Sequence, residues 1–246
     1  MNDNPNIPLI FAHRGASKIA PENTLKAFKK AIDLKADFIE FDLRQSSDGH
    51  LVITHDEDLS RLTGIKRMAN SLSLQSLKSL DFGEGEKIPT LEEMIHLTKN
   101  KIKLNCEITV PNIGGKVIEF LEKYRIINST IISSFLHEEL IKIKKLCPEI
   151  KIASLEPTPY MKKLDWREKE QMVKFCIENE FYSINPLVIM VDQKLVNYAH
   201  DFDIKVFPWT VNVKIAIKKL LKLGVDGIIT DDIELLKTLI DEFKRN

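Results

Sequence analysis

The repeating unit of the fold occupies residues 8–43, which read PLIFAHRGASKIAPENTLKAFKKAIDLKADFIEFDL. An apolar run begins this segment at 8–13, and a second apolar run ends it at 37–43. Between the two runs, apolar side chains recur at the spacing of one helix face, at Leu25, Phe28 and Ile32. The segment therefore predicts a strand, a helix and a second strand, and two strands joined in this way lie parallel in one sheet.

The same pattern continues along the chain. Further apolar runs, each followed by a helix-like segment, lie at 102–108, 129–134, 151–155, 181–185, 204–209 and 225–230. Eight strand–helix units in 246 residues match a (β/α)8 TIM barrel of the α/β class better than a doubly wound open sheet. No low-complexity linker divides the chain, so we expect one barrel domain over 1–246.

Polar residues gather where the predicted strands end. Those at or just past a strand end are His13, Asp42, Glu107, Ser134, Trp209 and Asp231. In a (β/α)8 barrel the active site lies at the carboxyl ends of the strands. This clustering supports both the barrel and a site at its mouth.

One connection, at about 44–88, is too long for an ordinary strand-to-helix loop. It contains a hairpin signal, Asp48-Gly49, and a weak helical segment at 73–80. Long loops in compact domains are usually functional. We expect a small insertion after the second strand that shapes the substrate pocket.

The composition narrows the class of protein. The chain has 36 basic and 36 acidic residues, and this balance argues against a nucleic-acid partner. No apolar stretch is long enough for a transmembrane helix, and no secretory leader is recognisable, so no stable membrane insertion is expected. The three cysteines, Cys106, Cys147 and Cys176, form neither a disulfide nor a zinc pattern, which indicates a reducing cytoplasm.

Three carboxylates are candidate metal ligands. Glu40 and Asp42 share one face of their strand because side chains alternate along it. Glu107, which shares a face with Asn105 on the next predicted strand, would complete the set. The donors suit one hard divalent ion, Mg²⁺ or Ca²⁺, and suit zinc poorly. Barrel lysines or arginines are the alternative partners for Glu40 and Asp42.

Two histidines are candidate proton carriers. His13 and His55 have an ordinary pKa, roughly 6.5, close to working pH, and Arg14 offers a bidentate donor for a phosphate. Glu22 either orients Arg14 or begins a helix, and Trp209 either packs against substrate or fills the top of the barrel. We expect the other histidines to be structural or on the surface, namely His50, His96, His137 and His200.

In order and spacing, these residues resemble the glycerophosphodiester phosphodiesterase family. The matching pieces are His13-Arg14-Gly15, Pro21-Glu22-Asn23-Thr24, the strand Ala36 to Asp42, Asp48-Gly49 with His55-Asp56, Ile88 to Glu93, Leu104 to Ile108, Ser133-Ser134-Phe135, Trp209 to Asn212 and Gly224 to Asp231. Each piece is weak alone, but the ordered set is specific and spans essentially the whole chain.

The resemblance implies a metal-dependent hydrolase that converts glycerophosphodiesters, such as glycerophosphocholine or glycerophosphoethanolamine, to an alcohol and sn-glycerol 3-phosphate. His13 and His55 would be the acid–base pair, and Arg14 would bind phosphate. Glu40, Asp42 and Glu107 would hold the metal. The chain departs from the family at Thr109, where a lysine is common, and at Arg61-Leu62-Thr63, where Arg-Thr-Thr is common.

Two other functions stay open at this point. A lysophospholipase D would need an apolar groove, to which Leu62, Ile65 and Met68 in the insertion can contribute. A barrel that binds a metal or phosphate without turnover is the second alternative. The expected partner in the leading interpretation is a small glycerophosphodiester.

Overall fold

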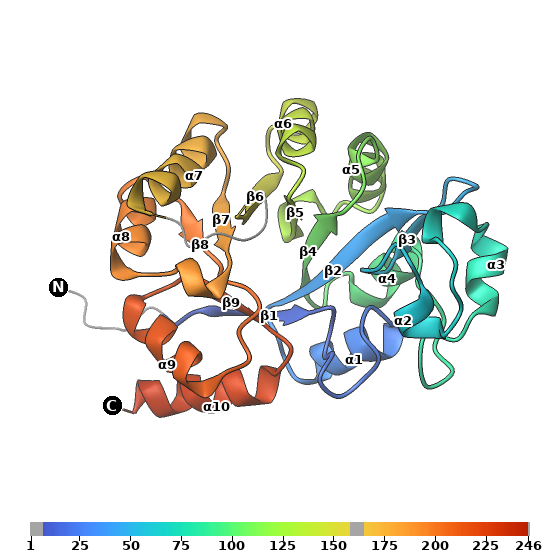
Figure 1. Ribbon diagram of the computed structural model, residues 1–246, viewed down its shortest axis with the longest axis horizontal. Helices are drawn as coiled ribbons and strands as arrows, with labels where there is room; N and C mark the ends of the chain where they lie inside the picture. Colours follow the sequence, from blue (N-terminus) through green and yellow to red (C-terminus); the bar gives the residue numbers. More distant parts are fainter. Residues whose placement is uncertain (1–6, 158–164, 246) are drawn as a thin grey trace.

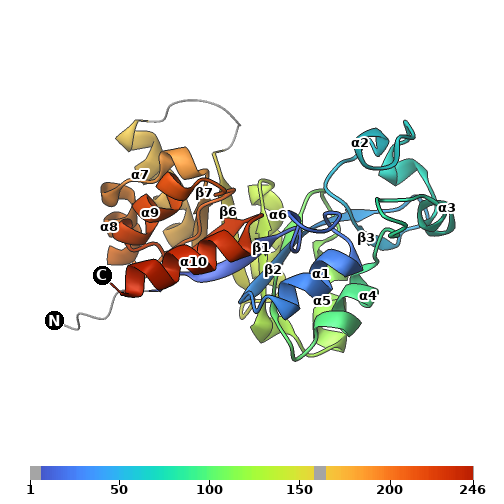
Figure 2. The ribbon, with the colours of Figure 1, turned by 90° about the horizontal axis from the view of Figure 1, so that it is seen from below.

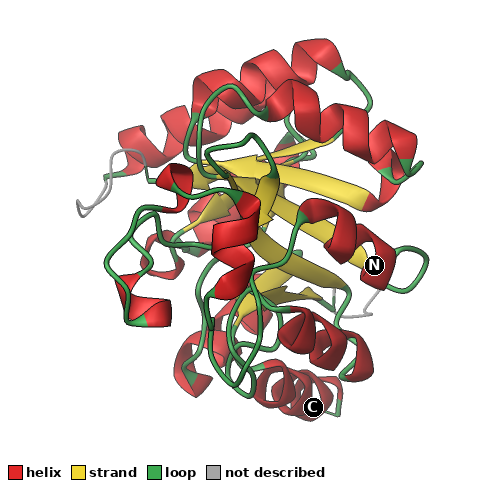
Figure 3. Cartoon of the chain, turned by 90° about the vertical axis from the view of Figure 1, so that its right-hand side faces the viewer, coloured by secondary structure: helices red, strands yellow, loops and turns green. Residues whose placement is uncertain are grey.

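Eight parallel strands form a barrel at the centre of the molecule, and helices surround it (Figures 1 and 3). The computed structural model describes residues 7–157 and 165–245. The strands of the barrel are β1 (Leu9–His13), β2 (Phe38–Gln45), β4 (Lys103–Ile108), β5 (Thr130–Ser134), β6 (Lys151–Glu156), β7 (Ser183–Pro186), β8 (Lys205–Val206) and β9 (Gly227–Thr230). Their order is β8-β7-β6-β5-β4-β2-β1-β9, which confirms the predicted TIM barrel.

Backbone hydrogen bonds join β8 and the two residues after it to β9 and the residue before it, and these bonds close the barrel. The amide of Asp226 donates to the carbonyl of Val206 at 3.1 Å, and that of Ile229 donates to Pro208 at 3.0 Å. The strand predicted at 204–209 is regular only over Lys205–Val206. The amides of Phe207 and Trp209 still donate to β7, at Ile184 and Pro186, but Pro186 has no amide hydrogen to donate back.

Helices follow the strands in the predicted alternation. Around the barrel they are α1 (Leu25–Asp33), α4 (Leu91–Thr98), α5 (Gly114–Lys123), α6 (His137–Leu146), α7 (Trp166–Glu178), α8 (Gln193–Asp201), α9 (Lys214–Leu223) and α10 (Ile233–Lys244), with short 3₁₀ turns η2 (Ile127–Ser129) and η3 (Val188–Met190). In α1 the Thr24 side chain accepts a hydrogen bond from the Ala27 amide and caps the helix. The apolar faces of the helices and the outer face of the strands form the main core.

Aromatic rings fill the interior of the barrel near its amino-terminal end. Phe11 stacks on Phe38 with ring centroids 4.4 Å apart and lies 4.8 Å from Phe207. Gly227 makes room for these rings, because a Cβ at that position would lie 2.7 Å from a Phe11 ring carbon. With this end filled by side chains, the site described below lies at the carboxyl ends of the strands.

The long connection after β2 forms a lobe beside the barrel (Figure 2). Its elements are β3 (Leu51–Ile53), α2 (Ser60–Thr63), η1 (Ala69–Ser71) and α3 (Leu74–Ser79). β3 pairs antiparallel with β2, as the Asp48-Gly49 turn predicts. The lobe has a small apolar core of its own, which includes Leu59, Leu77 and Phe82. Within the described residues, no helix is both long and apolar enough to cross a membrane.

Candidate active site

A cavity of about 470 Å³ opens at the carboxyl ends of the barrel strands. His13 ends β1, Glu40 lies on β2 and Glu107 lies on β4, and all three line the cavity. The insertion contributes His55, which follows β3. Side chains predicted from four separate segments of the sequence are therefore brought to one cavity.

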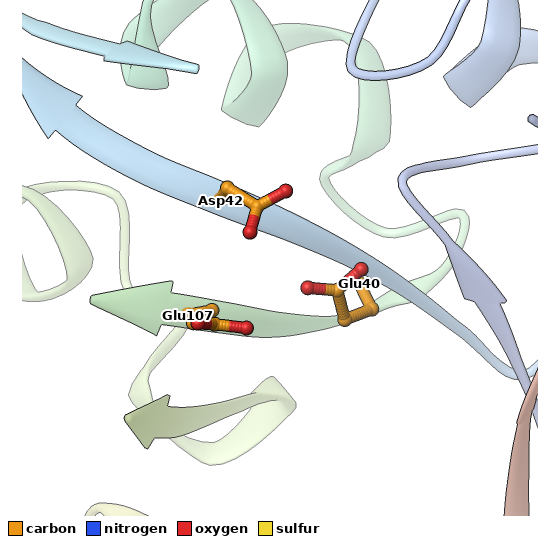
Figure 4. Close-up of side chains that lie close together, drawn as sticks. All are labelled: Glu40, Asp42 and Glu107. Carbon is orange, nitrogen blue, oxygen red and sulfur yellow. The ribbon is translucent and has the colours of Figure 1, made fainter. Parts of the chain in front are cut away.

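The three predicted metal ligands lie together. Carboxylate oxygens of Glu40, Asp42 and Glu107 lie within 4.8 Å of one another, and Figure 4 shows the two β2 side chains beside the β4 side chain. Burial, followed by the negative charge of Asp42, raises the pKa of both Glu40 and Glu107 well above the ordinary value. Three clustered carboxylates are a donor set that a hard divalent cation fits.

Arg14 is the cation that faces this cluster from the barrel. Its amide donates to Glu40 Oε2 at 2.9 Å, and its Nε lies 3.3 Å from Asp42 Oδ2. Glu107 has no ion pair within the described residues. The charge of Arg44 also acts on Glu107, where it opposes the rise in pKa. Two guanidiniums do not balance three carboxylates, so the alternative in which arginines and lysines alone satisfy the cluster is incomplete.

A tight turn after β1 places Arg14. Arg14 and Gly15 both have positive φ, 55° and 82°, a conformation that favours glycine. A Cβ at Gly15 would lie 2.8 Å from the Ala27 backbone carbon of α1. The glycine after His13-Arg14 therefore lets the turn pack against α1 and directs Arg14 back over the cluster.

Each of the two histidines is held by a carboxylate. His13 Nδ1 lies 2.6 Å from Asp231 Oδ1, and His55 Nδ1 lies 2.6 Å from Asp56 Oδ1. A carboxylate at Nδ1 fixes the tautomer and leaves Nε2 for a substrate. The cavity thus has two oriented imidazoles beside one carboxylate cluster.

Asp231 is itself fixed by several donors. Ser17 Oγ donates to Asp231 Oδ1 at 2.9 Å, and Asn212 Nδ2 donates to Oδ2. Burial opposes ionisation of this carboxyl, but the hydrogen bonds from His13, Ser17 and Asn212 outweigh it. They hold the pKa of Asp231 at about 2, below the ordinary 3.8.

A charged network connects the insertion to the turn after β1. Arg61 of α2 donates through Nε to Asp56 Oδ2 at 2.6 Å and through its two terminal nitrogens to both oxygens of Glu22, at 2.7 and 3.0 Å. Glu22 also accepts from Arg14 at 2.9 Å. Of the two alternatives for Glu22, the structure shows the contact that orients Arg14.

Part of the cavity lining is apolar. It consists of Phe135, Leu155, Trp209 and Ile229. Trp209 Nε1 donates to the carbonyl of Asn185 at 2.7 Å, and its ring meets that of Phe135 edge-on at 5.5 Å. Trp209 therefore presents a fixed surface to the cavity.

One strand-end residue faces away from the cavity. Ser134 lies on the outer face of β5, where its hydroxyl donates to the carbonyl of Ile108 at 2.6 Å. The neighbouring Ser133 lines the cavity instead. Thr109, where the family commonly has lysine, donates to the carbonyl of Leu43 at 2.8 Å and is not among the cavity-lining residues.

Sequence reasoning assigned no role to Asp56, Asn105, Ser133 or Asp231. Two of them could have been found from the sequence. Asn105 shares a strand face with Glu107, and Asp231 lies at a strand end. None of the four other histidines lines the cavity: His50 is largely exposed, His96 packs on Tyr124, His137 stacks on Phe175 and His200 bonds Asp226.

The family relationship follows from comparison with known proteins. The model of the glycerophosphoryl diester phosphodiesterase family matches residues 13–235. This chain belongs to the glycerophosphoryl diester phosphodiesterase family. It is thus an enzyme of the phosphodiesterase class, as the resemblance of its motifs implied.

Named relatives of the phosphodiesterase family match over nearly their whole length. A glycerophosphodiester phosphodiesterase of Caldanaerobacter subterraneus subsp. tengcongensis is 39% identical, over 94% of this chain and 97% of that protein. One from Bacillus altitudinis is 34% identical, over 90% and 94%. Among solved structures, a phosphodiesterase of Oleispira antarctica in complex with the product sn-glycerol-3-phosphate has a TM-score of 0.83 and 28% identity, over 96% of this chain and 97% of that one.

Proposed function

We propose that the chain hydrolyses glycerophosphodiesters, such as glycerophosphocholine or glycerophosphoethanolamine, to an alcohol and sn-glycerol 3-phosphate. The observation that carries the proposal is that one cavity is lined by two carboxylate-bound histidines and by Glu40 and Glu107 of the Glu40–Asp42–Glu107 cluster. The named relatives and the product complex of the Oleispira antarctica enzyme support the same substrate class.

Hydrolysis needs a base for the attacking oxygen and an acid for the leaving alcohol oxygen. His13 and His55 supply this pair, because both line the cavity and each has its Nδ1 held by a carboxylate. Arg14 lies over the cluster and binds the phosphate. The acid–base pair can serve either of two routes. In one, water attacks the phosphate directly; in the other, a neighbouring glycerol hydroxyl attacks, and water then opens the cyclic phosphate.

Glu40, Asp42 and Glu107 hold one divalent ion in this proposal, Mg²⁺ or Ca²⁺. When bound, the ion supplies positive charge that stabilises the phosphate oxygens as negative charge builds on them. The oxygen-only donor set and the close approach of the three carboxylates support a hard ion. Trp209 and Phe135 form the surface against which the carbon chain of the substrate packs.

Glycerol 3-phosphate release from glycerophosphocholine tests the proposal. We expect release with Mg²⁺ or Ca²⁺ and none with excess EDTA. His13→Ala and His55→Ala should each lower kcat at least about a hundredfold, whereas His96→Ala, which alters a histidine away from the cavity, should leave it unchanged. Release that persists in EDTA, or in both histidine variants, would refute the proposed chemistry.

The lysophospholipase D alternative needs an apolar groove that continues from the cavity. Ile65 and Met68 have exposed side chains, at 45% and 41%, but neither they nor Leu62 line the cavity. Leu62 packs on the core of the insertion. The glycerophosphodiester is therefore the better-supported substrate, and a lysophospholipid that reacts at least tenfold faster would reverse this order.

A further inference from the structure

Two buried polar side chains in the cavity have no role in the mechanism above. Asn105 and Ser133 are each 1% exposed, and both line the cavity. Within the described residues, neither the amide nitrogen nor the amide oxygen of Asn105 has a hydrogen-bond partner, and neither has the hydroxyl of Ser133. Buried polar groups in folded proteins are almost always satisfied, so these atoms require an explanation.

The strand register places both side chains beside the carboxylate cluster. Asn105 is level with Glu40 across β2 and β4, and Ser133 is level with Glu107 across β4 and β5. Asn105 lies two residues before Glu107 on the same face, so Asn105 and Glu40 form a layer that is deeper in the barrel than the layer of Asp42, Glu107 and Ser133. Both side chains therefore border the cluster, where a substrate with its phosphate at the cluster presents the groups next to the phosphate.

The chemistry of the two side chains selects the group that they bind. The Asn105 amide has two N–H donors and an acceptor oxygen, and the Ser133 hydroxyl can donate one hydrogen bond and accept others. Each side chain can both donate and accept, and so can a hydroxyl, whereas a phosphate would use only their donors and an ammonium group only their acceptors. The glycerol of a glycerophosphodiester carries two adjacent hydroxyls, each a donor and an acceptor.

We propose that Asn105 and Ser133 form a hydroxyl-binding subsite that recognises the glycerol unit of the substrate. This inference rests on the proposed function and adds to it the residues that select glycerol. A subsite of this kind discriminates strongly between phosphodiesters with and without glycerol hydroxyls. A substrate without them leaves the buried Asn105 amide and Ser133 hydroxyl unpaired.

The test compares two substrates on Ser133→Ala and Asn105→Ala. Glycerophosphocholine has the glycerol hydroxyls, and bis(p-nitrophenyl) phosphate has none. We expect kcat/KM for glycerophosphocholine to fall about tenfold or more in each variant, since a hydrogen bond of this kind contributes roughly that factor. The kcat/KM for bis(p-nitrophenyl) phosphate should stay within about twofold.

Ser134→Ala is the matched control. Ser134 is the next residue of the same strand, equally buried, and its hydroxyl is already bonded to the Ile108 carbonyl and to the Leu136 amide outside the cavity. This variant should have a lower Tm, with kcat/KM unchanged on both substrates. The contrast separates loss of a substrate contact from loss of folded protein.

The outcomes are distinguishable from those of the proposed function. If the unaltered enzyme releases glycerol 3-phosphate but both variants lose the two substrates equally, the subsite is refuted. A loss that added Mg²⁺ restores also refutes it, because Asn105 would then act on the metal. If the unaltered enzyme releases no glycerol 3-phosphate, the proposed function fails and this inference fails with it.

Discussion

At the scale of single residues, the contact of His13 with Asp231 governs proton transfer in the proposed reaction. The carboxylate fixes which nitrogen of His13 faces the cavity. Asp231→Asn should lower kcat about a hundredfold or more, because the amide can hold the ring with the wrong tautomer. Steady-state kinetics checks this expectation. Asp232→Asn is the control, since Asp232 pairs with Lys18 and does not contact His13.

Asp231 also predicts an acid dependence of stability. Its pKa in the folded state is about 2, below the ordinary 3.8, so the ionised carboxylate stabilises the folded protein above about pH 4. That contribution is lost as the pH falls from about 4 to about 2. The difference in unfolding free energy between the unaltered protein and Asp231→Asn should shrink across this window. Urea titrations at several pH values would contradict the assignment if the difference stayed constant.

Alanine substitutions at two adjacent serines of β5 should differ in their effect on the free energy of unfolding. Ser134→Ala removes two hydrogen bonds and leaves a buried carbonyl and a buried amide without their side-chain partner, which should cost about 1–3 kcal/mol. Ser133→Ala removes a hydroxyl that has no partner within the described residues, and should be neutral or stabilising. Chemical denaturation measures both, and an equal loss would contradict the difference in hydrogen bonding between the two serines.

These serines also show what the sequence could not resolve at this scale. The apolar run at 129–134 located the strand correctly, but a shift of one residue exchanges the two faces of a strand. The sequence drew attention to Ser134 at the strand end, whereas the structure turns Ser133 to the cavity. Only the register with β4 and β6 fixes which serine faces inward.

At the scale of elements, one guanidinium joins the residues that orient His55 to those that orient Arg14. Arg61 joins Asp56, which holds His55, to Glu22, which holds Arg14. A lysine has the same charge but not the planar set of donors that bonds both carboxylates. Arg61→Lys should therefore lower kcat/KM about tenfold with little change in Tm, because the Arg61 side chain is about half exposed.

The control for Arg61 is Arg67→Lys, an exposed arginine of the same insertion. Enzyme kinetics of the two variants, with Glu22→Gln and the Arg61→Lys, Glu22→Gln double variant, measures the coupling. If the effects of Arg61→Lys and Glu22→Gln on kcat/KM are additive in the double variant, Arg61 does not act through Glu22.

Elements with a strong local pattern were predictable. The apolar runs gave all eight barrel strands, and the Asp48-Gly49 turn gave the β2–β3 hairpin. The predicted strand at 204–209 is regular over only two residues, although the amides of Phe207 and Trp209 continue to donate to β7. The position of α2 was not predictable, because its contacts are charged groups from distant parts of the sequence.

At the scale of the whole molecule, the barrel concentrates negative charge that destabilises the fold without a metal. Glu107→Gln removes one of three neighbouring carboxylates. It should raise the Tm of metal-free protein, because a neutral side chain costs less to bury than a charged one and is not repelled by Glu40 and Asp42. The same change should abolish the rise in Tm on addition of Mg²⁺ or Ca²⁺. Thermal unfolding with and without each metal checks both expectations. A metal-induced rise that survives in Glu107→Gln would exclude this residue as a ligand.

The candidate site was predictable to the extent that its residues follow strand ends. The five residues proposed for proton transfer and metal binding lie in the first half of the chain, in segments with recognisable patterns. Their partners were harder to predict, since Asp231 reaches His13 only because β9 lies next to β1. Sequence spacing does not predict this contact, because β9 and β1 become neighbours only when the barrel closes.

The pairing of β9 with β1 has a consequence for the order in which a ribosome makes this protein. Translation delivers His13, His55 and all three carboxylates of the cluster before the chain is half complete. Asp231 is delivered more than two hundred residues after His13. A nascent chain that stalls before that point carries the proposed metal ligands and both histidines, but His13 lacks the carboxylate that orients it. The proposed proton transfer by His13 therefore requires a chain whose translation has passed the last strand.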